Sequence, residues 1–118
     1  MSLSEILAKK CASEALEKKA ENVVILNVAA LTSFADYFVV CSAPSERQTQ
    51  AIAQHVMEEV KASGTTVLGI EGLEDSEWVL LDMGDVILHV FSTEARLHYD
   101  LEGFWSKAPR EYIDSSTH

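Results

Sequence analysis

Apolar residues recur at two different spacings along the first half of the chain, and the two spacings predict different elements. In residues 3–20 the apolar side chains fall near helical spacing with Lys and Glu between them, which indicates an amphipathic helix. Residues 23–28 and 37–41 are short runs that are apolar on both faces, as expected for strands covered on both sides. A second stripe at helical spacing predicts a helix from Ser45 to a stop at Gly64.

The start of this second helix could serve structure or chemistry. Ser45 to Gln48 reads as a capping box, in which the Ser45 hydroxyl accepts from the Gln48 amide and the Gln48 side chain reaches back. A strand that leads into a helix can also bind phosphate, but glycine-rich spacing is missing here and Pro44 removes one amide donor. No G-x-S-x-G elbow surrounds Ser42 or Ser45. We therefore expect a structural helix cap.

The second half of the chain begins with strand-like spacing. Residues 65–70, 78–82 and 85–91 predict three more strands. Met83-Gly84 lies between the last two runs and is typical of a tight hairpin turn, in which Gly84 tolerates a positive φ.

A shorter helix is expected after these strands, over residues 92–102. Leu97 and Leu101 stand at i,i+4 in it, and Gly103 is placed to end it.

Together these elements predict the α/β class, with one mixed five-stranded sheet flanked by helices. A length of 118 residues fits a single domain over 1–118. We expect its core to span about 3–110, because Pro109 marks the start of a tail. Residues 115–118 are expected to be frayed.

Charge narrows the possible partners. The chain carries 19 acidic and 9 basic residues, a net charge of −10, and no Lys or Arg occurs between Lys61 and Arg96. Nucleic-acid affinity comes mostly from Lys and Arg, so extensive contact with RNA or DNA is disfavoured. A basic protein partner is favoured instead. A solvated acidic face that only aids solubility would explain the same composition.

The two cysteines and the lack of a long apolar stretch bear on location. Cys11 and Cys41 lie in apolar runs without zinc or disulfide spacing, so we expect buried free thiols in a reducing compartment. No apolar stretch approaches 18 residues, and no secretory leader pattern is visible. A cytoplasmic protein that does not span a membrane is expected.

One small cluster could support catalysis. Asp82, Asp85 and His89 lie close in sequence and could bind Mg²⁺ or transfer protons, as in a metal-dependent nucleotidyltransferase or phosphohydrolase. Asp is also a common turn residue, so the hairpin alone explains both acids. His89 alternates with Ile87 and Phe91 on one strand face, and a histidine among such apolar neighbours is usually a hydrogen-bonded core or interface residue. His55, in contrast, is expected to be solvated. We expect no metal site and no cofactor.

A group of aromatic residues suggests a different kind of site. Tyr, Trp and Arg often anchor protein interfaces. Here they are mixed with acids rather than bases, which suits a protein-docking surface better than stacking on nucleic acid. The alternative is that the aromatic rings only close the core. The group comprises Trp78, Arg96, His98, Tyr99, Asp100, Phe104 and Trp105.

Four blocks of the sequence, in this order and spacing, resemble the Iojap family, known in bacteria as the ribosomal silencing factor RsfS. They are LTSFADYFVV, SERQTQAIA, WVLLDMGDVILHVF after IEG, and RLHYDLEGFW followed by AP. The resemblance covers about residues 3–110. Two departures are visible. Ala43-Pro44 stands where the family usually has Gly followed by a small hydroxyl residue, and Gly103-Phe104 stands where it usually has Arg or Lys followed by Leu.

The resemblance implies a non-enzymatic α/β domain with nucleotidyltransferase-like topology and no catalytic motif. It implies binding to the large ribosomal subunit through ribosomal protein L-fourteen, which blocks joining of the small subunit and represses translation under nutrient limitation. Little direct rRNA contact and no DNA binding are expected, and the free protein could form a homodimer. The partner-binding residues expected on this basis are Trp78, Leu80, Asp82, His89, Tyr99, Asp100 and Trp105.

Overall fold

The computed structural model describes residues 2–113, and it confirms the α/β class with a mixed sheet. The expected fraying of residues 115–118 concerns positions outside the described residues. The helices are α1 (Leu3–Glu17), α2 (Glu46–Ala62), α3 (Thr93–Tyr99) and α4 (Leu101–Phe104). The strands are β1 (Glu21–Asn27), β2 (Tyr37–Ala43), β3 (Gly69–Glu71), β4 (Trp78–Asp82), β5 (Val86–Ser92) and β6 (Arg110–Ile113).

The sheet has six strands in the order β3-β4-β5-β2-β1-β6, so the expectation of five was wrong. Strands β2 and β5 pair in parallel at its centre, and the other neighbours are antiparallel. The sixth strand follows Pro109, where a tail was expected. Proline is tolerated just before an edge strand because its missing N–H is not needed there, and the Pro109 carbonyl accepts from Asn27 at 2.8 Å.

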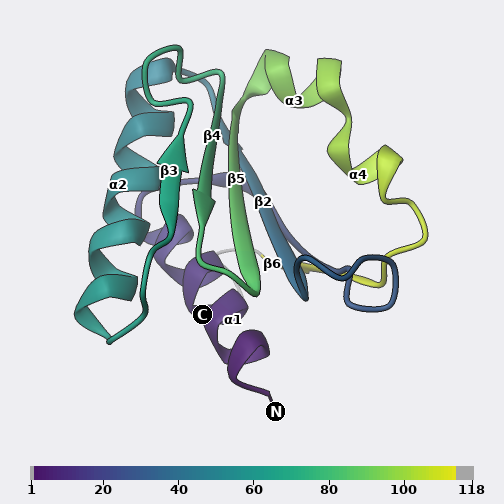
Figure 1. Ribbon diagram of the computed structural model, residues 1–118. Helices are drawn as coiled ribbons and strands as arrows, with labels where there is room; N and C mark the ends of the chain where they lie inside the picture. The colour runs from purple at the N-terminus through teal and green to yellow at the C-terminus, as the bar shows by residue number, and fades with distance from the viewer. Residues whose placement is uncertain (1, 114–118) are drawn as a thin grey trace.

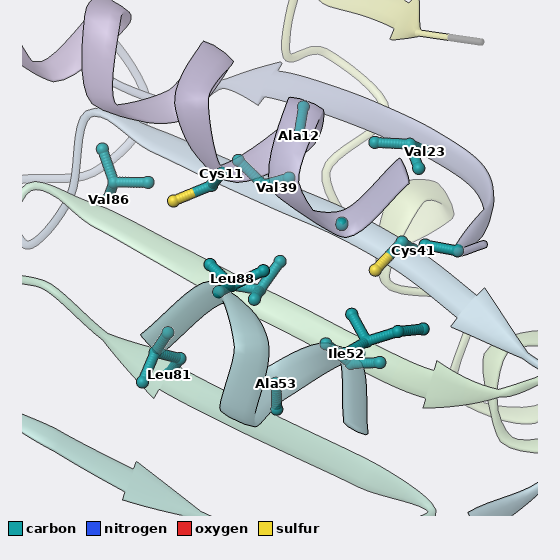
Figure 2. Packing of buried hydrophobic residues seen from close by; sticks show 14 of the residues in the cluster. Cys11, Ala12, Val23, Val39, Cys41, Ile52, Ala53, Leu81, Val86 and Leu88 are labelled. Atoms are coloured by element: carbon teal, nitrogen blue, oxygen red, sulfur yellow. The ribbon is translucent and has the colours of Figure 1, made fainter. Parts of the chain in front are cut away.

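Helices α1 and α2 cover one face of the sheet (Figure 1). Figure 2 shows Cys11 and Ala12 of α1 and Ile52 and Ala53 of α2 packed against strand residues such as Leu88, all in one buried cluster. Both cysteines are free and buried, as predicted. Burial raises the pKa of each thiol to about 12, so the thiolate is not formed near neutral pH.

Two ends of predicted elements were wrong. The strand expected over 65–70 is only Gly69–Glu71, because the chain leaves α2 and first reaches the sheet where the Leu68 amide donates to Asp82 at 2.8 Å. The helix expected over 92–102 breaks at Asp100, which has a left-handed φ of +46° and caps α4. Gly103 therefore lies inside α4 rather than after a helix, and Leu97 is 80% exposed.

One of the two hydrogen bonds predicted for the cap of α2 is confirmed. The Gln48 amide donates to Ser45 Oγ at 3.2 Å. The Gln48 side chain does not reach back to Ser45. It donates instead to the carbonyls of Lys18 and Lys19 at 3.4 Å each, because the end of α1 leaves carbonyls without helical partners. The cap therefore also joins the two long helices.

His55 was expected to be solvated, and this was wrong. Its Nε2 lies 2.8 Å from Glu14 Oε1, and its side chain is only partly exposed. Glu14 is on α1 and His55 on α2, so packing of the two helices creates a pairing that the sequence of neither helix indicates.

Candidate functional site: the aromatic face of the sheet

The second face of the sheet is covered by the short helices α3 and α4, the segment around them and the loop between β1 and β2 (Figure 1). The loop between β1 and β2 lies beside the segment after α4, and the rings of Phe34 and Trp105 are 6.5 Å apart there. We call this side the aromatic face, and it comprises Phe34, Phe38, Trp78, Leu80, His89, Phe91, Tyr99, Phe104 and Trp105.

Strand alternation builds this face, as the sequence predicted for β5. Val86, Leu88 and Val90 face the helices, whereas Ile87, His89 and Phe91 face the aromatic side. In β4, Trp78 and Leu80 share that second side.

The antiparallel register then sets the pairs across β4 and β5. It places Trp78 opposite Phe91, Leu80 opposite His89 and Asp82 opposite Ile87. Expected site residues from two strands thus lie side by side.

His89 is a buried hydrogen-bonded residue at the centre of this face. It is 4% exposed, and its Nδ1 accepts from Trp78 Nε1 at 3.1 Å. This contact places the proton of the neutral ring on Nε2. Burial lowers the pKa of His89 to about 4, so the ring is neutral near pH 7. His89 therefore positions Trp78 and does not itself reach the surface.

Tyr99 and Trp105 occupy the outer part of the aromatic face. Tyr99 is 50% exposed, and its ring centroid lies 4.9 Å from that of Trp78. Trp105 is half-buried, with its ring edge-on to Phe38 at 5.3 Å. The tryptophans therefore close the core with one side and line the surface with the other.

The two expected acids of the site have structural contacts. Asp82 Oδ1 accepts from the Gly84 amide at 2.8 Å and stabilises the hairpin turn. Asp100 Oδ1 accepts from the Gly103 amide at 3.2 Å and caps α4.

Asp82, Asp85 and His89 do not assemble into a metal site. Within residues 2–113, no group of three or more His, Cys, Asp or Glu side chains could hold a metal ion. Asp85 is exposed beyond the end of β4, and its carbonyl accepts from the amides of Asp36 and Tyr37. The alternative of a metal-dependent nucleotidyltransferase or phosphohydrolase is not supported.

Three exposed apolar residues on this side are not among the partner-binding residues expected from the sequence. Phe34 and Phe104 are exposed and belong to the aromatic face, and Leu97 projects from α3. For Phe34 and Phe104, the available signal was a large apolar side chain that fits no periodic pattern, whereas Leu97 fits the i,i+4 spacing with Leu101. Phe34 lies in the loop between β1 and β2, and Phe104 follows a glycine.

The loop between β3 and β4, which leads into Trp78, carries acidic residues and is fixed by side-chain hydrogen bonds. Gln50 Nε2 donates to Ser76 Oγ at 2.6 Å, and Thr49 Oγ1 donates to the Ser76 carbonyl at 2.7 Å. Ser76 is fully buried, so the loop between β3 and β4 is fixed to α2. The exposed acids here are Glu71 at the end of β3 and Glu74, Asp75 and Glu77 in the loop. Glu77 directly precedes Trp78, so this acidic loop borders the aromatic face at the start of β4.

No helix within residues 2–113 has the length and apolar character needed to cross a membrane.

Fold and site together describe a small α/β domain whose mixed sheet has one helix-covered face and one aromatic face. A family model described as "Ribosomal silencing factor during starvation" matches residues 2–118. The chain is 43% identical over 93 residues to ribosomal silencing factor RsfS of Halalkalibacterium halodurans, covering 79% of this chain and 80% of that protein. It is 36% identical over 108 residues to RsfS of Bacillus subtilis, covering 92% of each.

A crystal structure of a Chromobacterium violaceum protein has the same fold, with a TM-score of 0.87 and 30% identity, covering 98% of this chain and 95% of that one. The chain therefore belongs to the RsfS family of ribosomal silencing factors, and the resemblance of its four sequence blocks is confirmed.

Proposed function

We propose that this chain is a non-enzymatic, cytoplasmic silencing factor that binds the large ribosomal subunit through ribosomal protein L-fourteen. Bound there, it blocks association with the small subunit and represses translation when nutrients are scarce. The observation that carries the proposal is the aromatic face, where exposed rings stand on a rigid sheet beside an acidic border.

Tyr99 and Trp78 are the proposed anchors. Interface hot spots are enriched in Tyr and Trp, and each costs about 2 kcal/mol or more when truncated at the centre of an interface. The two rings contact each other, and His89 holds the Trp78 indole by a hydrogen bond. Because little side-chain freedom is left to lose, docking on this face is preorganised. Leu80 and Trp105 extend the apolar surface on either side.

Charge supports a basic protein as the partner. The acids beside Trp78 and the net charge of −10 attract Lys and Arg side chains and repel the phosphates of rRNA. Charged borders mainly raise the association rate and orient the encounter. We therefore assign Asp82 and the loop acids to steering and the aromatic residues to affinity.

A second copy of the chain would compete for the same surface. Leu97 and Phe104 are 80% and 79% exposed, and such side chains favour self-association. Light scattering of the free protein over a range of concentrations separates a monomer from a homodimer that must open before ribosome docking.

The function is tested with purified ribosomal subunits. Wild-type protein is expected to co-sediment with isolated large subunits and to lower the fraction of complete ribosomes formed after small subunits are added, as read on a sucrose gradient. Unchanged joining at protein concentrations that saturate the large subunit would refute the proposal.

A further inference from the structure

The carboxylate of Asp100 is held in place by the absence of a side chain at residue 103. Asp100 has a left-handed backbone, and its Oδ1 accepts from the Gly103 amide at 3.2 Å. A Cβ on residue 103 would overlap Asp100 Oδ2 and would lie 2.7 Å from Cγ. Any residue other than glycine therefore forces the carboxylate out of its present position.

Asp100 lines a cleft of about 550 Å³ that α3 and α4 share with the outer end of the sheet. The Arg96 guanidinium in this cleft is already engaged, because Nε and Nη2 donate to Glu102 Oε2 at 3.1 and 2.9 Å and Nη1 donates to Ser42 Oγ at 3.2 Å. Asp100 forms no salt bridge within residues 2–113. The cleft thus has one uncompensated negative charge.

The walls of the cleft suit a long side chain with a charged end. Leu97 and Tyr112 line it, and both are largely exposed. The alkyl part of a Lys or Arg side chain packs well against such an apolar surface while its charged end remains in a polar environment. A tyrosine ring also attracts a cation placed over its face. An anion would meet the Asp100 carboxylate with no free guanidinium to offset it.

We propose that this cleft receives a Lys or Arg side chain of a basic partner protein, with its head on the Asp100 carboxylate, and that Gly103 positions that carboxylate. The inference rests on the proposed function, since it assigns a specific contact to the basic partner. Asp100 directly follows Tyr99, so the cleft adjoins the aromatic face.

Removing the charge tests the cleft. Asp100→Asn keeps an oxygen that can accept from the Gly103 amide but loses the carboxylate charge. We expect about tenfold weaker binding to isolated large subunits, as for loss of one charge-assisted contact. Glu58→Gln is the control, because it removes one exposed charge from α2 on the opposite face. Equal binding of the two variants, with wild type binding normally, overturns the proposal.

Gly103→Ala tests the positioning role in two backgrounds. In the wild-type background it should weaken binding several-fold by displacing the carboxylate. In the Asp100→Asn background it should cause no further loss. Its melting temperature should stay within about 4 °C of wild type, because the lost cap and the better helix propensity of Ala oppose each other. Equal weakening in both backgrounds means that Gly103 is merely structural and overturns its role.

A negative result for ribosome binding can be distinguished from a negative result for cation binding in the cleft. If wild-type protein does not bind large subunits, the proposed function is wrong, and the cleft is then judged with a hexalysine peptide by NMR. Amide shifts at Leu97 and Tyr112 that disappear in Asp100→Asn support the cleft. Absence of these shifts in wild-type protein overturns it.

Discussion

The two faces of the sheet are built from alternate residues of the same strands, yet they differ in composition and in cover. The face under α1 and α2 consists of aliphatic residues, alanines and two cysteines, most of them fully buried. The other face has aromatic rings, a buried histidine and half-buried tryptophans under two short helices. One face is buried by helices of the same chain, whereas the other leaves exposed rings on which we propose that a partner docks. Substitutions on the two faces should therefore separate stability from binding.

The largest effect is expected on the helix-covered face. Leu88 is fully buried there, and Leu88→Ala should lower the free energy of unfolding by about 2–5 kcal/mol through lost transfer energy and a cavity. Urea unfolding measures this change. Leu80→Ala is the matched control on the aromatic face, where the side chain is half-buried. An equal loss in the two variants would contradict the contrast between the faces.

A pH effect of similar size is expected from His89. Its folded-state pKa of about 4 lies below the ordinary value near 6.5, so the unfolded chain binds the proton more readily. The stabilisation is complete above pH 6.5 and falls by up to about 3 kcal/mol as the pH drops towards 4. His89→Gln keeps an acceptor for Trp78 Nε1 and should flatten this dependence. Parallel stability curves for wild type and variant would refute the assignment.

The smallest effect concerns the cap of α2. Ser45→Ala removes the acceptor for the Gln48 amide and should cost about 1 kcal/mol of stability. Because α2 lies on the helix-covered side, inhibition of subunit joining should be nearly unchanged in conditions where the variant is folded. A loss of inhibition without a loss of stability would show that the start of α2 contributes directly to function.

Local patterns predicted much of this contrast. Alternation in 85–91 placed His89 with Ile87 and Phe91, and the capping residues placed the start of α2. The apolar runs also predicted strands with two covered faces. They could not indicate what covers each face, because a helix and a partner protein require the same apolar side chains.

The errors arose where distant parts of the chain meet. Strand β6 is four residues long and forms by pairing with β1, which no local pattern indicates. The contact of His55 depends on Glu14 of another helix. The break at Asp100 is a local exception, because its side chain caps the amide of Gly103 in the same segment. For the aromatic face, the sequence identified Trp78 and Tyr99 and indicated a core or interface position for His89, but the pairing of His89 with Leu80 follows from the cross-strand register.

The most direct test of docking on the aromatic face compares two exposed residues on opposite sides of the sheet. Tyr99 is 50% exposed on the aromatic face, and Ile6 is 49% exposed on α1. In the subunit-joining assay, Tyr99→Ala should require about thirtyfold more protein for half-maximal inhibition, equivalent to about 2 kcal/mol. Ile6→Ala should match wild type. Wild-type inhibition by Tyr99→Ala, or an equal loss in both variants, would contradict docking through this face.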